Sequence, residues 1–392
     1  MSAVAAPGRP GGIRWNRLTN RLSARFGYGT VYSLGVYLAT RAAVALGVVT
    51  AYLLRRRLSW HGILTRYDAW WYQYIAAHGY GRHLRPQLAH DLYHARYSTW
   101  AFYPGYPLTI RGLHELTRLP YADAAFVLAL VFSALAVRAM YALGEAFGGQ
   151  PVARGSAALM AAWPGSAAMN LPYSEGLFIA ATAGSLAALL RRRWLVAGLL
   201  GAVATGTRAM GLALVVAAVV VAARELWTRR DLRVLAAPAL TASGVGAFYA
   251  FGWQQTGDTL VWRHAEDLWH QHLDFGAAVV FHLRHDLSRR GTHSVETLLL
   301  IVGLGLLALM VAAAVALRGR LQPALIAYAA VAAAMIVGYS QVGPRPRMAL
   351  AVVPGFVWLA RWLPPRLVEM LTVGLASALA LTAFLYVGVV VP

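Results

Sequence analysis

The apolar run TVYSLGVYLATRAAVALGVVTAYLL, from Thr30 to Leu54, decides the class of fold. It is longer than the roughly 20 residues that a helix needs to cross the hydrocarbon core of a bilayer. It is also too long for the core of a signal peptide, and no clear small-residue cleavage site follows it, so we expect it to be retained as a membrane anchor. Similar runs recur along the whole chain, which predicts a polytopic membrane protein.

The composition supports this class. Of the 392 residues, 59% are hydrophobic and 13% are charged, whereas a soluble domain carries about a quarter charged residues. The formal net charge is +20, and every basic residue is arginine because the chain has no lysine. This excess fits the positive-inside rule and an anionic lipid surface. The arginines are scattered between apolar runs, which argues against nucleic-acid binding, and the Ala-rich, Lys-free composition indicates a bacterial origin.

Apolar length and terminal arginine clusters predict an all-helical bundle of about eleven spans. Residues 1–29 form an arginine-rich cytoplasmic tail, and residues 30–392 form one integral-membrane domain. The least certain part of this topology is the pair of short apolar arms on either side of Arg208. If they form a single helix, the chain has ten spans and every later segment lies on the opposite side of the membrane. A hairpin at Arg208 is favoured because it places the later arginine clusters in the cytoplasm; the run Arg55–Arg57 breaks the rule in both topologies. After the first span, the others are expected near 124–147, 152–169, 175–190, 194–207, 209–223, 234–253, 297–317, 321–339, 348–363 and 367–391.

This topology brings the remaining polar segments to the outer face. We find no convincing internal repeat, which argues mildly against an inverted-repeat transporter. The outer segments are a long first loop at 55–122, the turn NLPYSEG at 170–176, TGTR at 205–208, a second large loop at 254–296 and SQVGPRPR at 340–347.

The first outer loop contains the stretch LTRYDAWWYQYIAAHGY, from Leu64 to Tyr80, in which one acid lies among aromatic residues. A helix that begins at Asp68 is apolar or amphipathic over more than half its circumference, which predicts a helix in the membrane interface. Asp68 has two interpretations of equal weight from spacing alone. It caps the helix, or it is a partly desolvated carboxylate that acts as a general base on a hydroxyl.

Several motifs resemble the PIG-V-like mannosyltransferases, a branch of the GT-C glycosyltransferases. RYDAWWYQYIAAHGY, from Arg66, is similar to the signature that follows the first span in that family, and FYPGYPL (Phe102–Leu108) to the segment after it. The resemblance is patchy but touches most of the chain, and the first motif is the most specific. The weaker motifs are WPGSAAMNLPYSEGLF (163–178), TGTRAMGLAL (205–214) and QQTGDTLVW (254–262).

This resemblance implies an integral-membrane transferase that uses a polyprenyl-phosphate sugar, with mannose as the expected sugar. Asp68 occupies the position of the catalytic base. An inverting transfer needs one base and no second carboxylate as nucleophile, by analogy with inverting glycosidases. The leaving group is a lipid phosphate, which arginine can bind through two oxygens. No cofactor is expected, and the partners are the lipid-linked donor, a hydroxyl acceptor of the cell envelope and membrane lipids.

Four arginines on the outer face are candidates for the phosphate: Arg66, Arg208, Arg345 and Arg347. Arg208 is the strongest candidate. An unpaired charge between apolar arms costs about 2.5–3.5 kcal/mol or more, so it implies a function or a buried partner. The alternative is that its side chain snorkels to the interface. For Arg345 and Arg347 the alternative is a solvated turn.

The other predicted substrate-binding residues each have a structural alternative. Glu175 can cap a helix, Asp258 can close a turn, and Trp269 can stack on a sugar or lie in the aromatic belt. Tyr103 and Tyr106 are expected in a cavity wall, because broken backbone at membrane depth must face protein or a cavity; the alternative is that they are anchors in the aromatic belt. Tyr67 and Tyr173 are included from their motifs.

A metal site is the weaker interpretation of the histidines. His90 and His94 have an i, i+4 spacing, but no H-E-x-x-H motif and no third ligand is evident. The stretch RHAEDLWHQH contains further candidates: His264, Glu266, Asp267, His270 and His272. With no cysteine, the chain has no disulfide, thiol nucleophile or cysteine ligand. The rivals to a transferase are a lipid or solute transporter and a non-catalytic subunit of envelope assembly.

Overall fold

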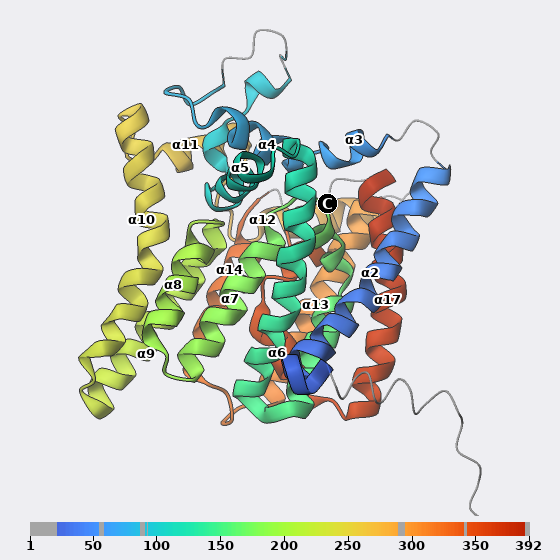
Figure 1. Cartoon of the computed structure of the whole chain (residues 1–392), viewed down its shortest axis with the longest axis vertical. Helices are drawn as coiled ribbons and strands as arrows, with labels where there is room; N and C mark the ends of the chain where they lie inside the picture. Colours follow the sequence, from blue (N-terminus) through green and yellow to red (C-terminus); the bar gives the residue numbers. More distant parts are fainter. Residues whose placement is uncertain are drawn as a thin grey trace, which may run out of the picture.

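The structure is a computed structural model of the whole chain, and it describes residues 22–54, 59–86, 91, 93–288, 295–340 and 343–388. Most of the expected cytoplasmic tail, the run Arg55–Arg57 and His90 lie outside these ranges. Within them the regular elements are helices, and a single isolated bridge joins Leu273 to Tyr339. The predicted all-helical bundle is therefore confirmed (Figure 1).

The first span is α2 (Tyr28–Leu54), as expected, and α6 (Tyr121–Ala162) follows the first loop. α6 is a hairpin of two arms, because the backbone is non-helical at Gly148 and Gly149, where Gly149 has φ 77°. The arms then pack on each other, and Ser156 Oγ lies 3.5 Å from Met140 O. The two spans expected in this region correspond to these two arms.

The chain also reverses at Arg208. Helix α7 (Glu175–Leu190) leads to one end of the bundle, where Arg191 pairs with Glu145 at 2.8 Å. Helix α8 (Trp194–Thr205) returns to the other end, where Arg208 pairs with Glu175 at 2.5 Å. Helix α9 (Leu212–Arg229) then runs back again. The hairpin at Arg208 is therefore correct, and the single-helix alternative is wrong.

Further helices complete the bundle and its connections. They are the short helices η1 (His94–Arg96), η2 (Thr99–Ala101), η3 (Pro164–Asn170), η4 (Ala209–Gly211) and η5 (Leu232–Leu235), and the helices α10 (Ala236–Thr256), α12 (Ala277–Ser288), α13 (Val295–Ala316), α14 (Pro323–Gly338), α15 (Pro346–Ala349), α16 (Val353–Trp362) and α17 (Pro365–Gly388).

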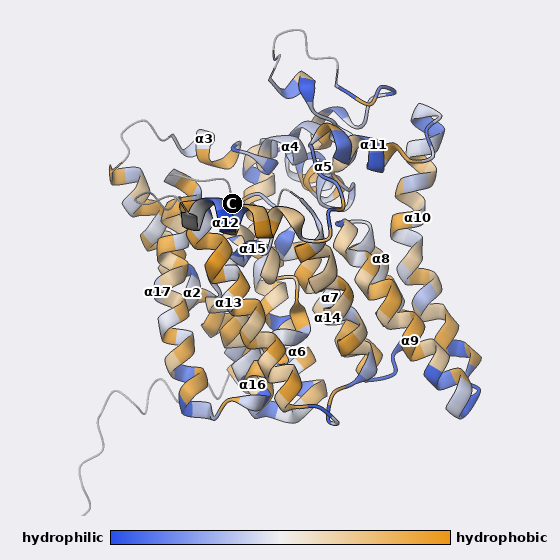
Figure 2. Ribbon diagram, turned by 180° about the vertical axis from the view of Figure 1, so that it is seen from behind, coloured by the Kyte–Doolittle hydropathy of each residue, from blue (hydrophilic) through white to orange (hydrophobic). Residues whose placement is uncertain are grey.

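Not every expected span is a full-length membrane helix. In the described part of the chain, six helices are long and apolar enough to cross a bilayer, or seven if η3 and α7, which are bent by 111°, form one broken span. α8 and α14 are apolar but shorter, and α16 has only 10 residues. The expectation of about eleven spans gives the right reversals but overestimates the number of full-length helices. Hydrophobic residues dominate the middle of the bundle, and hydrophilic residues gather at its ends (Figure 2).

Four helices form a layer over one end of the bundle: α3 (Trp60–Leu64), α4 (Asp68–His78), α5 (Gly105–Thr117) and α11 (Val261–Leu268) (Figure 1). Helix α4 begins at Asp68 as predicted. Its aromatic residues do not all face outward, because Trp71 and Tyr72 are buried and contact Phe102, with ring centroids 5.6 and 5.3 Å apart. The layer is packed onto the protein and covers the ends of the spans.

The topology predicts the result of site-specific labelling. Because the chain has no cysteine, single cysteines at Gln254 and Ser340 should react with an impermeant reagent from the same side of the membrane. A cysteine at Thr228 should react only from the opposite side, since α9 leads there. The hairpin at Arg208 places Arg192, which pairs with Glu225, at the same end of the bundle as Thr228, so labelling of cysteines at positions 192 and 228 from opposite sides would contradict it.

Candidate active site

Asp68 is the first residue of α4, but it does not cap that helix. The N-cap is Tyr67, which has φ 55° and ψ −128°, and no side chain caps the first turn. The Asp68 carboxylate instead accepts a hydrogen bond from Arg347, with 2.6 Å between Oδ2 and Nη2. Its other oxygen accepts no hydrogen bond in the described residues. The capping interpretation is therefore wrong, and Asp68 is available for chemistry.

Arg347 joins segments that are far apart in the sequence. Its Nε donates to Glu175 Oε1 at 2.6 Å, while its Nη2 donates to Asp68. The ring of Tyr173 lies 4.6 Å from the guanidinium carbon. The Arg347 side chain is only 4% exposed. Burial of a charge this deep is favourable only with such partners, so these contacts fix the position of the guanidinium.

Arg208 has a buried partner, as its place between two apolar arms predicted. Its Nη1 donates to Glu175 Oε1 at 2.5 Å and to Ser174 Oγ at 3.2 Å. Tyr72 also contacts Ser174, with 2.8 Å between the two hydroxyl oxygens. One carboxylate oxygen of Glu175 thus holds two arginines, and Glu175 serves as their anchor rather than as a helix cap.

Two close backbone contacts bring the motifs together. A Cβ on Gly165 would lie 2.2 Å from Pro346 O, which also accepts a hydrogen bond from Trp163 Nε1 at 2.9 Å. This contact holds the segment that carries Arg347. On the other side, Gly105 N donates to Gly206 O at 2.8 Å, next to Arg208. A side chain at either glycine would push an arginine segment away.

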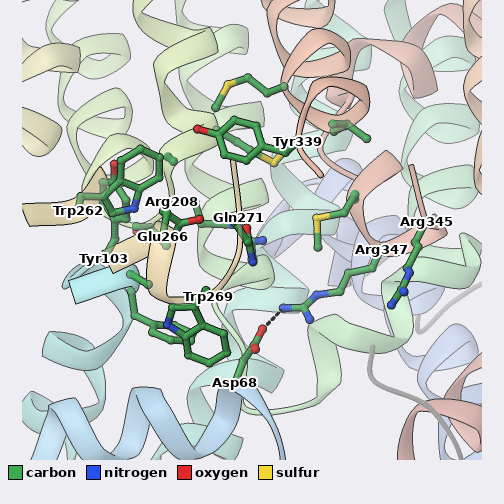
Figure 3. A pocket seen from close by; sticks show the side chains of 18 of the residues that line it. Asp68, Tyr103, Arg208, Trp262, Glu266, Trp269, Gln271, Tyr339, Arg345 and Arg347 are labelled. Carbon is green, nitrogen blue, oxygen red and sulfur yellow. Dashed lines mark hydrogen bonds and ion pairs between the residues drawn. The ribbon is translucent and has the colours of Figure 1, made fainter. Parts of the chain in front are cut away.

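These segments surround a cavity of about 420 Å³ under the layer of short helices, which is within the roughly 300–1,000 Å³ of small-molecule sites. Figure 3 shows Asp68 on its wall, joined to Arg347, with Arg345 close by. Six predicted site residues line this cavity: Asp68, Tyr103, Arg208, Trp269, Arg345 and Arg347.

The other predicted residues lie outside the cavity. Tyr173 and Glu175 are buried behind it and hold Arg347. Arg66 stacks on Tyr67 at 4.8 Å and donates from Nη1 to Val387 O at 2.6 Å, so both residues brace the start of α4. Tyr106 is buried and donates to Ala125 O at 2.7 Å, so it belongs to the core.

Asp258 is also outside the cavity. Its carboxylate accepts a hydrogen bond from Leu260 N at 2.8 Å and lies 2.6 Å from His264 Nδ1. The hydrogen bond with His264 lowers the pKa of Asp258. These contacts match the alternative interpretation of Asp258 as a residue that closes a turn.

Another acid of the same loop, Glu266, lines the cavity and was not predicted as a substrate-binding residue. Trp262 and Glu266 of α11 and its C-cap Trp269 have the spacing i, i+4 and i+7 of one helix face, and all three line the cavity. In the sequence, Trp269 was predicted to bind substrate but Glu266 was assigned only to the possible metal site; their helical spacing is the signal that indicates Glu266. Further lining residues that the sequence analysis missed are Gln271, Glu296 and Tyr339.

Among the described residues, no group of three or more His, Asp or Glu side chains is placed to hold a metal ion. His94 instead pairs with Asp91 at 2.5 Å and stacks on Trp70 at 3.8 Å.

The cavity combines an oriented carboxylate with guanidinium groups. Arg208 and Arg345 have side chains that are 18% and 21% exposed, so part of each can reach a ligand. Arg345 pairs only loosely, at 3.6 Å, with the exposed Glu296. Such groups can bind a phosphate, while the free oxygen of Asp68 can accept a proton.

Known proteins similar to this chain were found by sequence and by structure. No family model matches the chain. A curated relative, GPI alpha-1,6-mannosyltransferase 2 of Cricetulus griseus, is 34% identical over 161 residues. The match covers 38% of this chain and only 30% of the relative, so the chain spans less than a third of that protein.

The most informative solved structure is that of ArnT from Cupriavidus metallidurans bound to undecaprenyl phosphate. The structural match covers 87% of this chain and 62% of the ArnT chain, with a TM-score of 0.55 and 16% sequence identity. The chain has a GT-C fold. The partial sequence match supports the resemblance to the PIG-V-like branch of the GT-C proteins. The Archaeoglobus fulgidus oligosaccharyltransferase covers 89% of this chain and 55% of its own at 12% identity and a TM-score of 0.44.

The environment of Glu266 makes a testable prediction. Burial raises the pKa of Glu266 from an ordinary value of 4.5 to about 8, and Asp267 adds to the rise. Between these values the folded GT-C domain binds a proton that the unfolded chain releases, so the stability due to this group falls as pH rises. Glu266→Gln should therefore raise the melting temperature at pH 8 but not at pH 4.5.

The measurement is a thermal melt in detergent across this pH range. Glu115→Gln is the control for loss of an exposed acid, because Glu115 lies in a separate exposed pair with Arg111. A melting difference between Glu266→Gln and the native chain that is constant with pH would contradict the raised pKa.

Proposed function

We propose that this protein is an inverting glycosyltransferase that moves a sugar, mannose, from a polyprenyl-phosphate donor to a hydroxyl acceptor. The observation that carries the proposal is the Asp68 carboxylate, held by Arg347 on the wall of a cavity that two further arginines share. A base and a phosphate site within one cavity are the two elements that this reaction needs.

In the proposed reaction, Asp68 accepts the proton of the acceptor hydroxyl as its oxygen attacks the anomeric carbon. The bond between that carbon and the phosphate oxygen breaks, and the polyprenyl phosphate leaves with both bonding electrons. Attack from the face opposite the phosphate inverts the anomeric centre. Asp68 never bonds to the sugar, so a second catalytic carboxylate is not required.

The lipid-linked donor is supported by the fold and by the cavity. The structure of ArnT with a similar fold has undecaprenyl phosphate bound. In this chain the cavity wall also includes the apolar side chains of Met335, Ile336 and Met348, which suits an isoprenoid in the same cavity as a phosphate.

Mannose as the sugar rests on the name of the curated relative and on the motif resemblance. A bacterial cell-envelope glycan, lipid or protein is the proposed acceptor. We propose further that the N-terminus is cytoplasmic, that the cavity opens on the outer side of the cell membrane, and that no cofactor takes part.

The role of Asp68 predicts the effect of its amide. Asp68→Asn keeps the size of the side chain and an oxygen that can accept from Arg347, but removes the proton acceptor. Transfer of labelled sugar from polyprenyl-phosphate mannose to envelope lipids should slow by about 10²–10⁴-fold. The melting temperature should fall, because buried Arg347 loses one of its two carboxylate partners, but the chain should still fold since Glu175 remains. The control is Glu115→Gln, because this acid lies in an exposed pair with Arg111. Full transfer by Asp68→Asn would remove Asp68 as the base.

The phosphate site is tested at Arg345, whose loose pair with Glu296 contributes little to stability. Arg345→Gln should raise the KM for the donor by about tenfold or more, because it removes a charge-assisted hydrogen bond. The KM of Arg345→Lys should lie between those of the native chain and of Arg345→Gln, since lysine keeps the positive charge but cannot bind two phosphate oxygens as the guanidinium group does. Arg263→Gln is the control, because its side chain is 60% exposed and it does not line the cavity. An unchanged KM in Arg345→Gln would place the phosphate elsewhere.

A further inference from the structure

The end of the cavity away from Arg345 and Arg347 has a different chemistry. Figure 3 shows Tyr103, Trp262 and Glu266 on the side opposite these two arginines, with Gln271 between the two sides. Arg208 is also labelled on this side, but its guanidinium donates to Glu175 and Ser174 behind the cavity. The other groups at this end, apart from Glu266, are aromatic or amide. A phosphate is therefore better bound at Arg345 and Arg347, and the aromatic end is left for another part of the substrate.

Several polar groups at the aromatic end have no partner in the described part of the protein. The Glu266 carboxyl group accepts and donates no hydrogen bond there, although the residue is only 9% exposed. The indole N–H of Trp262 is buried and unpaired as well. The side-chain amide of Gln271 also lines the cavity without a hydrogen bond to the described residues. Buried polar groups are nearly always hydrogen-bonded, so this end is built to receive a polar ligand.

Glu266 is not placed to bind a cation. No arginine or histidine of the described residues pairs with its carboxyl group, and the charged neighbour that affects it is the acid Asp267. Because burial raises the pKa of Glu266 to about 8, the carboxyl group is mostly neutral at pH 7. A neutral carboxyl group donates one hydrogen bond through O–H and accepts others through its carbonyl oxygen.

We propose that Glu266 binds hydroxyl groups of the sugar carried by the lipid-phosphate donor, together with Gln271 and the indole N–H of Trp262. This proposal rests on the proposed function and adds the sugar subsite to it. Hydroxyl groups both donate and accept, as do the neutral carboxyl and amide groups of this subsite. The tryptophan rings on either side of Glu266 along α11 offer apolar faces to the C–H groups of a sugar ring.

The order of groups along the cavity supports the donor sugar as the occupant. In the proposed arrangement the phosphate binds at Arg345 and Arg347, and Asp68 lies between Arg347 and Trp269 (Figure 3). A sugar bonded to that phosphate and extending away from these two arginines is directed toward Gln271 and Glu266 (Figure 3). A neutral Glu266 also avoids repulsion of the phosphate, which an ionised carboxylate in the same cavity would cause.

The experiment compares two ligands on the purified full chain in lipid nanodiscs: undecaprenyl phosphate, and the same lipid phosphate carrying mannose. Binding is measured through the fluorescence of the tryptophans, including Trp262 and Trp269, in the native chain and in Glu266→Ala, Glu266→Gln and Asp267→Asn. Glu266→Ala should weaken binding of the mannosylated lipid by about tenfold and leave binding of the bare lipid phosphate unchanged. Glu266→Gln should keep most of the affinity, because the amide also donates and accepts.

The control Asp267→Asn should bind both ligands as the native chain does, since Asp267 is half exposed and pairs with Arg263. Equal weakening of both ligands in Glu266→Ala would show a structural role and overturn the sugar subsite. Unchanged binding of the mannosylated lipid would overturn it as well, while transfer of mannose by the native chain would leave the proposed function intact. Failure of the native chain to bind either ligand would overturn the proposed function, and the subsite with it.

Discussion

The buried guanidinium of Arg347 is the interaction on which the candidate site depends. It is held by Glu175 and by Asp68, residues that lie 172 and 279 positions away in the sequence. A charge that is buried without partners destabilises a protein strongly. The segments that carry Asp68, Glu175 and Arg347 must therefore meet for these charged side chains to be buried. The close contact of Gly165 with Pro346 and that of Gly105 with Gly206 allow the backbones to approach far enough for this to happen.

The sequence predicts the class of this fold well, because apolar length and the position of arginines are local properties. It also predicts that Asp68 and Arg208 are important, since a charge within an aromatic or apolar run has a cost that only a partner or a function offsets. The partners themselves were not predictable. Arg345 and Arg347 are two residues apart in a proline-rich turn, yet only Arg347 reaches Asp68, and tertiary packing against Trp163 and Gly165 decides between them.

The same limit explains the two acids of the second large loop. Asp258 lies in a motif that resembles the family and was predicted to bind substrate, but a turn keeps it outside the cavity. Glu266 lies in a histidine-rich stretch that suggested a metal site. Its spacing from Trp262 and Trp269, however, is that of residues on one helix face. The length of the short helices was likewise not predictable from local sequence. Hydropathy shows that the region of α16 is apolar, but not that the helix has only 10 residues.

The pairing of Arg347 also accounts for how charge can move during the proposed reaction. Before transfer, one nitrogen of Arg347 balances Asp68, and another balances Glu175. When Asp68 accepts the proton it becomes neutral, while the departing lipid phosphate gains one negative charge. Arg347 then has a new anion within the same cavity, and Glu175 still holds its Nε in place. A guanidinium with two fixed partners can therefore stabilise charge first on the base and then on the leaving group without moving, which is the preorganisation that lowers a barrier. Lysine at this position has a single ammonium and no fork, so it would have to leave one partner to serve the other.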